Sequence, residues 1–123
     1  MVKKILVVDD KTEDLDTMKT LLEKNGYKVA VALDGTKALE ILRKNSFDLI
    51  LIDVLMPKLS GYDLLRLVRE KLNHGIIMVY ISIVPRQEVD MTDVDGFIQK
   101  PFSPKSFLNE IKKALLKFGR NKK

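Results

Sequence analysis

The chain has 123 residues, which is enough for one domain with a buried core and too few for two. It contains no cysteine and a single histidine, which excludes disulfides, thiolate or histidine-cluster metal sites and a cysteine nucleophile. The formal net charge is +5, and part of this excess lies in a basic tail at residues 119–123 that follows a predicted domain over residues 1–118. A short basic tail is typically a solvated chain end, so nucleic-acid binding is not expected.

No apolar stretch of the sequence reaches the length that a bilayer requires, so we expect no membrane partner. Lys3 and Lys4 precede an apolar run that is too short for a signal peptide. We therefore expect a cytoplasmic protein.

The first strand is predicted at residues 2–8, which are apolar and mostly β-branched apart from two lysines. It ends at two consecutive carboxylates, Asp9 and Asp10. Thr12 then offers a capping hydroxyl for a helix whose apolar stripe consists of Leu15, Met18, Leu21 and Leu22.

A second strand is predicted at residues 27–33. Asp34 caps the helix that follows and ends near Asn45, with an inward face of Ala38, Leu39 and Leu42. The third strand, residues 49–52, is a continuous apolar run that stops at Asp53. Such a run is typical of a strand buried on both faces of a parallel sheet.

A third helix is predicted after Gly61, with an inward face of Leu64, Leu65, Val68 and Leu72. Its end is expected at residues 73–75, where His74 would be exposed and without a role. The fourth strand follows at residues 76–83 and carries Ser82 near its carboxyl end.

The segment over residues 84–95 shows little periodicity, and we expect at most a short helix around residues 86–91. A short fifth strand at residues 96–99 leads to Lys100. Ser103 caps the last helix, whose inward face is predicted as Phe107, Leu108, Ile111, Leu115 and Phe118.

Strands and helices thus alternate five times at short spacing, which predicts an α/β fold with a doubly wound, five-stranded parallel sheet. The expected strand order is 2-1-3-4-5, as in flavodoxin-like folds.

In this order the first and third strands are neighbours, so Asp9, Asp10 and Asp53 should converge at the carboxyl edge of the sheet. Taken singly, each could be a surface acid, and Asp53 could merely cap a turn. Together, three close carboxylates without histidine or cysteine favour a hard cation such as Mg²⁺. Ser82 and Lys100 follow adjacent strands and could hold the oxygens of a phosphoryl group, which indicates phosphoryl transfer onto a carboxylate.

Three motifs resemble those of the receiver domain of two-component response regulators. They are the Asp9–Asp10 pair, the stretch DVLMPKLSG at residues 53–61 and the stretch GFIQKPF at residues 96–102, and the resemblance covers essentially the whole chain. It implies a phosphoacceptor rather than an enzyme with its own substrate, catalysing only its own phosphoryl transfer and dephosphorylation. The implied partners are a histidine kinase or a phosphotransfer protein, and an unidentified downstream protein.

The same resemblance assigns roles to the acidic residues. Asp53 would be the phosphoacceptor. Asp10, Asp53 and the backbone carbonyl of Leu55 would ligate Mg²⁺, and Asp9 would help through a water molecule.

Further roles follow by resemblance on the fourth and fifth strands. Ser82 and Lys100 would hold the phosphoryl group, and the Lys100–Pro101 peptide would be cis. Phe97 would be the switch aromatic, which turns inward when the Ser82 hydroxyl moves toward the phosphate.

The chain departs from the family pattern in three places. The spacing from Ser82 to Lys100 is shorter than is usual in the family, so the fourth helix is expected to be shortened or replaced by a loop over residues 85–95. That face normally binds the partner, which places the usual output surface in doubt. Ile83 stands where Ala or Gly is preferred and could crowd the phosphoryl site. Leu55 and Val84 are apolar where many relatives are polar, so they should hinder the attacking water and give a long-lived phosphoryl group.

The sequence is also compatible with other functions. A pseudo-receiver would keep the fold as a constitutive interaction module and would be favoured if Ile83 blocked the Ser82 pocket. A flavodoxin-like cofactor binder fits less well, because carboxylates directly after the first strand would repel a phosphate without a metal. No output domain is expected after residue 118, so the signal would pass by protein contact, or the chain would act as a relay or sink.

Overall fold

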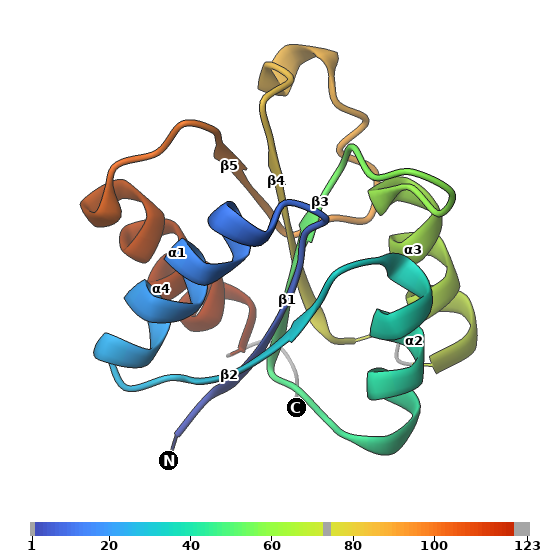
Figure 1. Cartoon of the computed structure of the whole chain (residues 1–123), viewed down its shortest axis with the longest axis horizontal. Coiled ribbons are helices and arrows are strands. Elements are labelled where there is room, and N and C mark those ends of the chain that lie inside the picture. The colour runs from blue at the N-terminus through green and yellow to red at the C-terminus, as the bar shows by residue number, and fades with distance from the viewer. Residues whose placement is uncertain (1, 73–74, 120–123) are drawn as a thin grey trace.

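The computed structural model describes residues 2–72 and 75–119, and for residues 117–119 it describes the backbone alone. Five parallel strands form one sheet in the order β2-β1-β3-β4-β5, as predicted (Figure 1). Their bounds are β1 Lys4–Val8, β2 Lys28–Ala32, β3 Leu49–Asp53, β4 Ile77–Ser82 and β5 Gly96–Gln99. The prediction for β1 was two residues too long at its start, and the predictions for β2 and β4 were one residue too long at each end.

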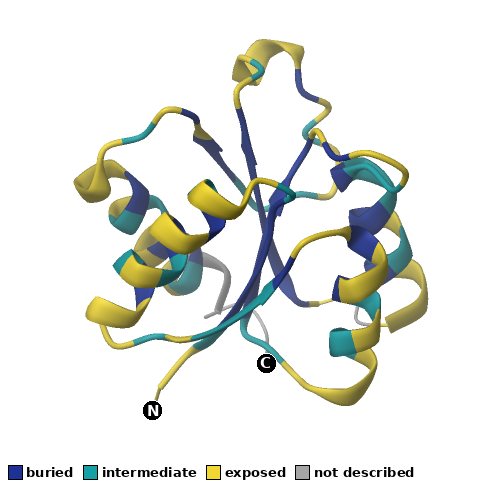
Figure 2. Cartoon of the chain, viewed as in Figure 1, coloured by how far each residue is buried: buried dark blue, intermediate teal, exposed yellow. Residues whose placement is uncertain are grey.

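Helices cover both faces of the sheet. Helices α1 (Thr12–Lys24) and α4 (Pro104–Gly119) pack on one face, and α2 (Gly35–Lys44) and α3 (Gly61–Leu67) pack on the other (Figure 1). Strands β3 and β4 are buried along their whole length, which explains why their sequences are continuous apolar runs (Figure 2). None of the described helices is both long and apolar enough to cross a membrane.

Two of the three predicted helix caps are confirmed. The Asp34 carboxylate accepts a hydrogen bond from the Lys37 backbone N–H at 2.8 Å, and Ser103 Oγ accepts one from the Ser106 N–H at 3.1 Å. The prediction for Thr12 is wrong, because Thr12 is the first helical residue of α1 and Lys11 occupies the cap position without a side-chain cap. The start of α1 was thus predicted one residue too late.

Helix α3 continues into a single π-helical segment, η1, at Val68–Leu72. Leu64, Leu65 and Val68 are buried as predicted, but Leu72 is 39% exposed, so its predicted inward position is wrong. A π-helical turn contains more residues than an α-helical turn, which shifts the residues after it off the apolar stripe. The expectations for residues 73–74, including an exposed His74, for the side chain of Phe118 and for the tail beyond residue 119 lie outside the described residues.

The connection between β4 and β5, residues 83–95, contains no α-helix and only a 3₁₀ turn, η2, at Arg86–Glu88. The predicted loss of the fourth helix is confirmed, and the helical part is shorter than the expected residues 86–91. Val89 is buried, and Met91 and Val94 pack against the same core cluster as α3. The connection therefore covers the sheet with apolar side chains although it lacks a regular helix.

Candidate functional site

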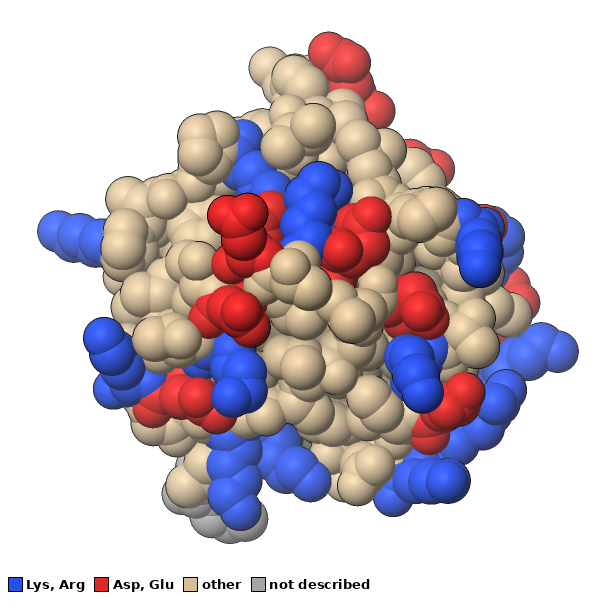
Figure 3. Space-filling view, viewed as in Figure 1, with Lys and Arg blue, Asp and Glu red and all other residues tan. Residues whose placement is uncertain are grey.

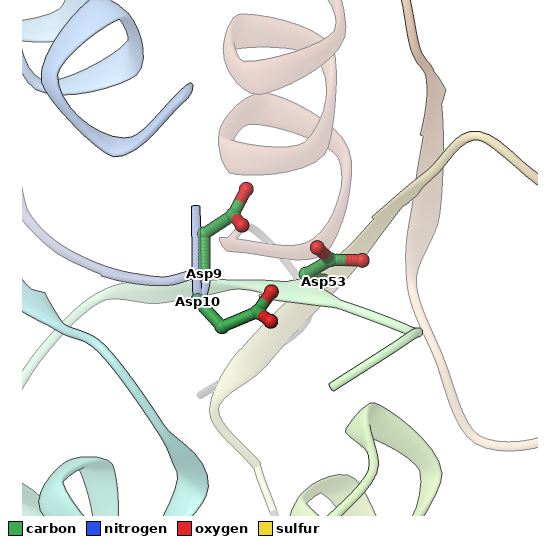
Figure 4. A group of neighbouring side chains, drawn as sticks. All are labelled: Asp9, Asp10 and Asp53. Carbon is green, nitrogen blue, oxygen red and sulfur yellow. The ribbon is translucent and has the colours of Figure 1, made fainter. Parts of the chain in front are cut away.

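Carboxylates from two neighbouring strands meet at the carboxyl edge of the sheet (Figure 4). Val8 pairs with Ile52 across β1 and β3, so the next residues, Asp9 and Asp53, lie side by side at the strand ends. Asp9 and Asp53 are buried, Asp10 is partly exposed, and carboxylate oxygens of all three lie within 4.8 Å of one another. The predicted convergence of these three residues is confirmed.

Two lysines approach this cluster. Lys100 is buried and precedes a cis Lys100–Pro101 peptide, and its ammonium donates to Asp9 Oδ2 at 2.8 Å and to Asp53 Oδ2 at 3.4 Å. The Lys11 ammonium lies 3.3 Å from Asp10 Oδ1 and 3.7 Å from Asp53 Oδ2. Figure 3 shows basic and acidic side chains side by side on the surface above this edge.

The Lys100 ammonium also donates to Asp14 Oδ2 at 2.8 Å, a contact between α1 and the end of β5. Sequence reasoning assigned roles to neither Asp14 nor Lys11. Asp14 was visible only as an acid in the first turn of α1, and no local pattern pairs it with a lysine 86 residues away.

The pKa of Asp53 is raised to about 6. Burial is the main cause and the neighbouring Asp9 carboxylate adds to it, and together they outweigh Lys100 and the Leu55 N–H. Burial alone would lower the pKa of Lys100, but its hydrogen bonds to Asp14 and Asp9 raise it above the usual lysine value. The strand ends therefore hold a carboxylate in an environment where negative charge is incompletely compensated.

The donor set fits a hard divalent cation. Among the described residues, four carboxylates, those of Asp9, Asp10, Asp14 and Asp53, face two ammonium groups. Three of them offer oxygens that lie close enough to share one ion, with no sulfur or nitrogen donor among them. Mg²⁺ prefers such oxygen ligands and would offset the excess negative charge.

The turn between β3 and α3 fixes the backbone beside Asp53. The Leu55 backbone N–H donates to Asp53 Oδ1 at 3.1 Å, while the Leu55 side chain is exposed. Ser60 Oγ caps α3 through the Asp63 N–H at 3.2 Å. A Cβ atom at Gly61 would lie only 2.5 Å from the Asp53 carbonyl oxygen, so this close approach of α3 to the end of β3 requires glycine.

Ser82 is joined to Lys100 through the backbone, since the Lys100 N–H donates to the Ser82 carbonyl at 2.8 Å, but among the described residues its side chain has no hydrogen bond to the three carboxylates. Ser82 is fully buried at the end of β4, and its Oγ accepts a hydrogen bond from the Val84 backbone N–H at 3.0 Å. Phe97 pairs with Tyr80 in the sheet register and is buried on the α2–α3 side. Ile83 is 62% exposed, so its side chain points away from the core.

The model of the response regulator receiver domain family matches residues 5–112. The chain belongs to this family. Among the solved structures, a CheY-like receiver domain from Methanospirillum hungatei superposes with a TM-score of 0.87 at 29% identity, covering 98% of this chain and 99% of that one. The response regulator TrrA of Thermotoga maritima, in complex with Mg²⁺ and BeF, superposes with a TM-score of 0.85 at 27% identity, covering 93% and 100%.

Curated relatives are longer than this chain. The nisin biosynthesis regulatory protein NisR of Lactococcus lactis is 34% identical over 99% of this chain and 54% of its own length. The probable transcriptional regulator ycf27 of Cyanophora paradoxa is 36% identical over 92% of this chain and 48% of its own length. The chain thus spans about half the length of the curated relatives that it matches. It is a response regulator receiver domain of two-component signalling, a family that binds Mg²⁺ at an acidic pocket.

Proposed function

We propose that Asp53 accepts a phosphoryl group from the phosphohistidine of a histidine kinase or phosphotransfer protein. One observation carries this proposal: the Asp53 carboxylate is buried between two further aspartates and within reach of the Lys100 ammonium. With a pKa of about 6, Asp53 is mostly ionised at neutral pH and can act as a nucleophile. Membership of the receiver domain family supports the other parts of the proposal, namely the kinase or phosphotransfer partner and the relay.

In the proposed reaction a carboxylate oxygen of Asp53 attacks phosphorus while the P–N bond to histidine breaks and the imidazole leaves. Lys100 and Ser82 would hold the phosphoryl oxygens as the acyl phosphate forms, with Ser82 exchanging its Val84 hydrogen bond for one to the phosphate. Asp10, Asp53 and the Leu55 carbonyl would hold Mg²⁺, with Asp9 acting through water. The ion would offset negative charge between the acceptor and the incoming phosphoryl group.

The proposed output is a protein contact controlled by phosphorylation. Movement of Ser82 toward the phosphate would be transmitted to Phe97, which pairs with Tyr80, two residues before Ser82 on β4. The chain would accelerate only the transfer and hydrolysis of its own phosphoryl group. We place this function in the domain over residues 1–118 and assign none to the tail over residues 119–123.

The acceptor can be located chemically. After incubation of the chain with acetyl phosphate and Mg²⁺, borohydride reduces an aspartyl phosphate to homoserine, which peptide mass spectrometry detects. We expect homoserine at position 53, and none in the Asp53→Asn variant. Homoserine at Asp9 or Asp10 instead would contradict the assignment.

A pseudo-receiver that is never phosphorylated is the second candidate. One observation favours it: Ser82 is fully buried and its Oγ already accepts a hydrogen bond from Val84. In that case the wild-type chain would show no homoserine under any donor, while the fold and the downstream contact persist. A faster reaction of Ile83→Ala would show that the branched side chain after Ser82 restricts the phosphoryl site.

A further inference from the structure

The Lys100 ammonium has three carboxylate partners among the described residues. It lies 2.8 Å from Asp9 Oδ2, 2.8 Å from Asp14 Oδ2 and 3.4 Å from Asp53 Oδ2. An ammonium group has three protons and no acceptor, so these contacts use its whole capacity. The two short contacts go to Asp9 and Asp14, and the longest goes to the proposed phosphoacceptor.

A phosphoryl oxygen on Asp53 can accept a hydrogen bond from the Lys100 ammonium only if one of these three carboxylates gives up its own hydrogen bond from Lys100. Asp9 is poorly suited to do so, because its side chain is fully buried and would be left with an uncompensated charge. The Asp14 side chain is 40% exposed, so water can replace the lysine at little cost. Of the two short contacts, the one to Asp14 is therefore the exchangeable one.

We propose that Asp14 is a positioning residue that competes with the phosphoryl group for Lys100. It holds the lysine toward α1 in the unphosphorylated chain and releases it when the phosphoryl oxygens arrive. This inference rests on the proposed function of Asp53 and extends it to a residue on another element. Asp14 is not one of the three carboxylates that could share an ion, and in this proposal it acts only through Lys100.

The test measures the binding of beryllofluoride, a phosphoryl analogue, to the whole chain with Mg²⁺ by ¹⁹F NMR. We expect Asp14→Asn to lower the apparent Kd of beryllofluoride about two- to fivefold, the range of a partly exposed ion pair. Glu13→Gln is the matched control, because it removes an exposed negative charge from the same first turn of α1. Circular dichroism checks the fold, and Asp14→Ser replaces Asp14→Asn if that variant does not fold.

A second readout follows the exchange itself. In the wild-type chain the ¹³C resonance of the Asp14 carboxyl should shift toward that of a solvated carboxylate when beryllofluoride binds, while the Glu13 resonance should not. An unchanged Kd in Asp14→Asn, an equal change in Glu13→Gln or a stationary Asp14 resonance would overturn the role of Asp14 alone. If the wild-type chain binds no beryllofluoride, the proposed function of Asp53 fails, and this inference fails with it.

Discussion

The carboxyl edge of β1 and β3 and the connection between β4 and β5 are built in different ways. At the edge, regular strands deliver Asp9 and Asp53 directly, and their positions follow from the strand register. The connection over residues 83–95 has no α-helix, and it is attached by Val89 in the core and by Arg69 from η1. The Arg69 guanidinium donates to the Asp93 carbonyl at 2.9 Å and to Asp95 Oδ2 at 2.9 Å.

Because they are built differently, the two regions should respond differently to substitutions. The edge depends on close backbone packing, so small steric changes there should be costly. The connection depends on a few side-chain contacts, and loss of one should loosen it while leaving the sheet intact. The following variants test this contrast, beginning with the largest expected effect.

Gly61→Ala should destabilise the chain by about 2–4 kcal/mol, because its Cβ would overlap the backbone at the end of β3. Gly96→Ala, at the start of β5, is the control. Its Cβ would meet Val79 at 3.5 Å, an ordinary contact, so a change within about 1 kcal/mol is expected. Urea unfolding measures both variants, and equal losses would show that the close approach of α3 to the end of β3 is not what makes this edge sensitive to an added methyl group.

Arg69→Met should cost about 1–3 kcal/mol, because it leaves the half-buried Asp95 carboxylate without its cation. Hydrogen exchange should accelerate over residues 89–95 and remain slow in β1 and β3. Arg66→Met removes an exposed pair with Asp63 on the neighbouring helix α3 and should change little. Faster exchange throughout the sheet would show that the connection is not an independent unit.

Asp53→Asn should stabilise the metal-free chain at neutral pH. The pKa of this carboxyl is raised from 3.8 to about 6, so the folded chain keeps a proton that the unfolded chain loses, and the wild type loses stability as pH rises through this range. The advantage of Asp53→Asn should be about 3 kcal/mol at pH 7.5 and fall to about 0.5 kcal/mol near pH 4. Denaturant unfolding in EDTA at both pH values measures it, and an advantage that is independent of pH would contradict the raised pKa.

Leu55→Asn should shorten the lifetime of the phosphoryl group about threefold, because a polar side chain beside Asp53 can orient the attacking water. This change corresponds to an activation free energy of hydrolysis that is lower by ~0.7 kcal/mol. This variant joins the two regions, since Val84 of the connection is the other apolar residue flanking the site. Loss of the phosphorylated mass after removal of the donor measures the lifetime. A phosphoryl group that lasts only seconds on the wild-type chain and equally long on Leu55→Asn would contradict the role of these apolar groups.

The regular parts of the molecule could be predicted from the sequence because their signals are local. Apolar runs that end on Asp9, Asp53 and Lys100 defined both the sheet and its charged edge. The contact of Asp14 with Lys100 could not be predicted in this way, because it depends on how α1 lies against the end of β5.

For the connection between β4 and β5, the sequence indicated only that the periodic spacing of apolar residues is missing. Nothing local pairs Arg69 with Asp95, and the π-helical segment that ends at an exposed Leu72 departs from the regular helical spacing. Ser82 was correctly placed at a strand end, but its hydrogen bond from Val84 depends on the irregular backbone that follows β4. Side-chain contacts made by irregular or distant segments therefore have no local signal in the sequence that would predict them.

The central claim is that Asp53 accepts a phosphoryl group with the help of Mg²⁺. Intact mass after incubation with acetyl phosphate, with Mg²⁺ or with EDTA, tests it most directly beside the Asp53→Asn variant. We expect a gain of one phosphoryl group in the wild-type chain with Mg²⁺ and no gain in EDTA or in the variant. A folded wild-type chain that gains none, or a variant that gains as much, would contradict it.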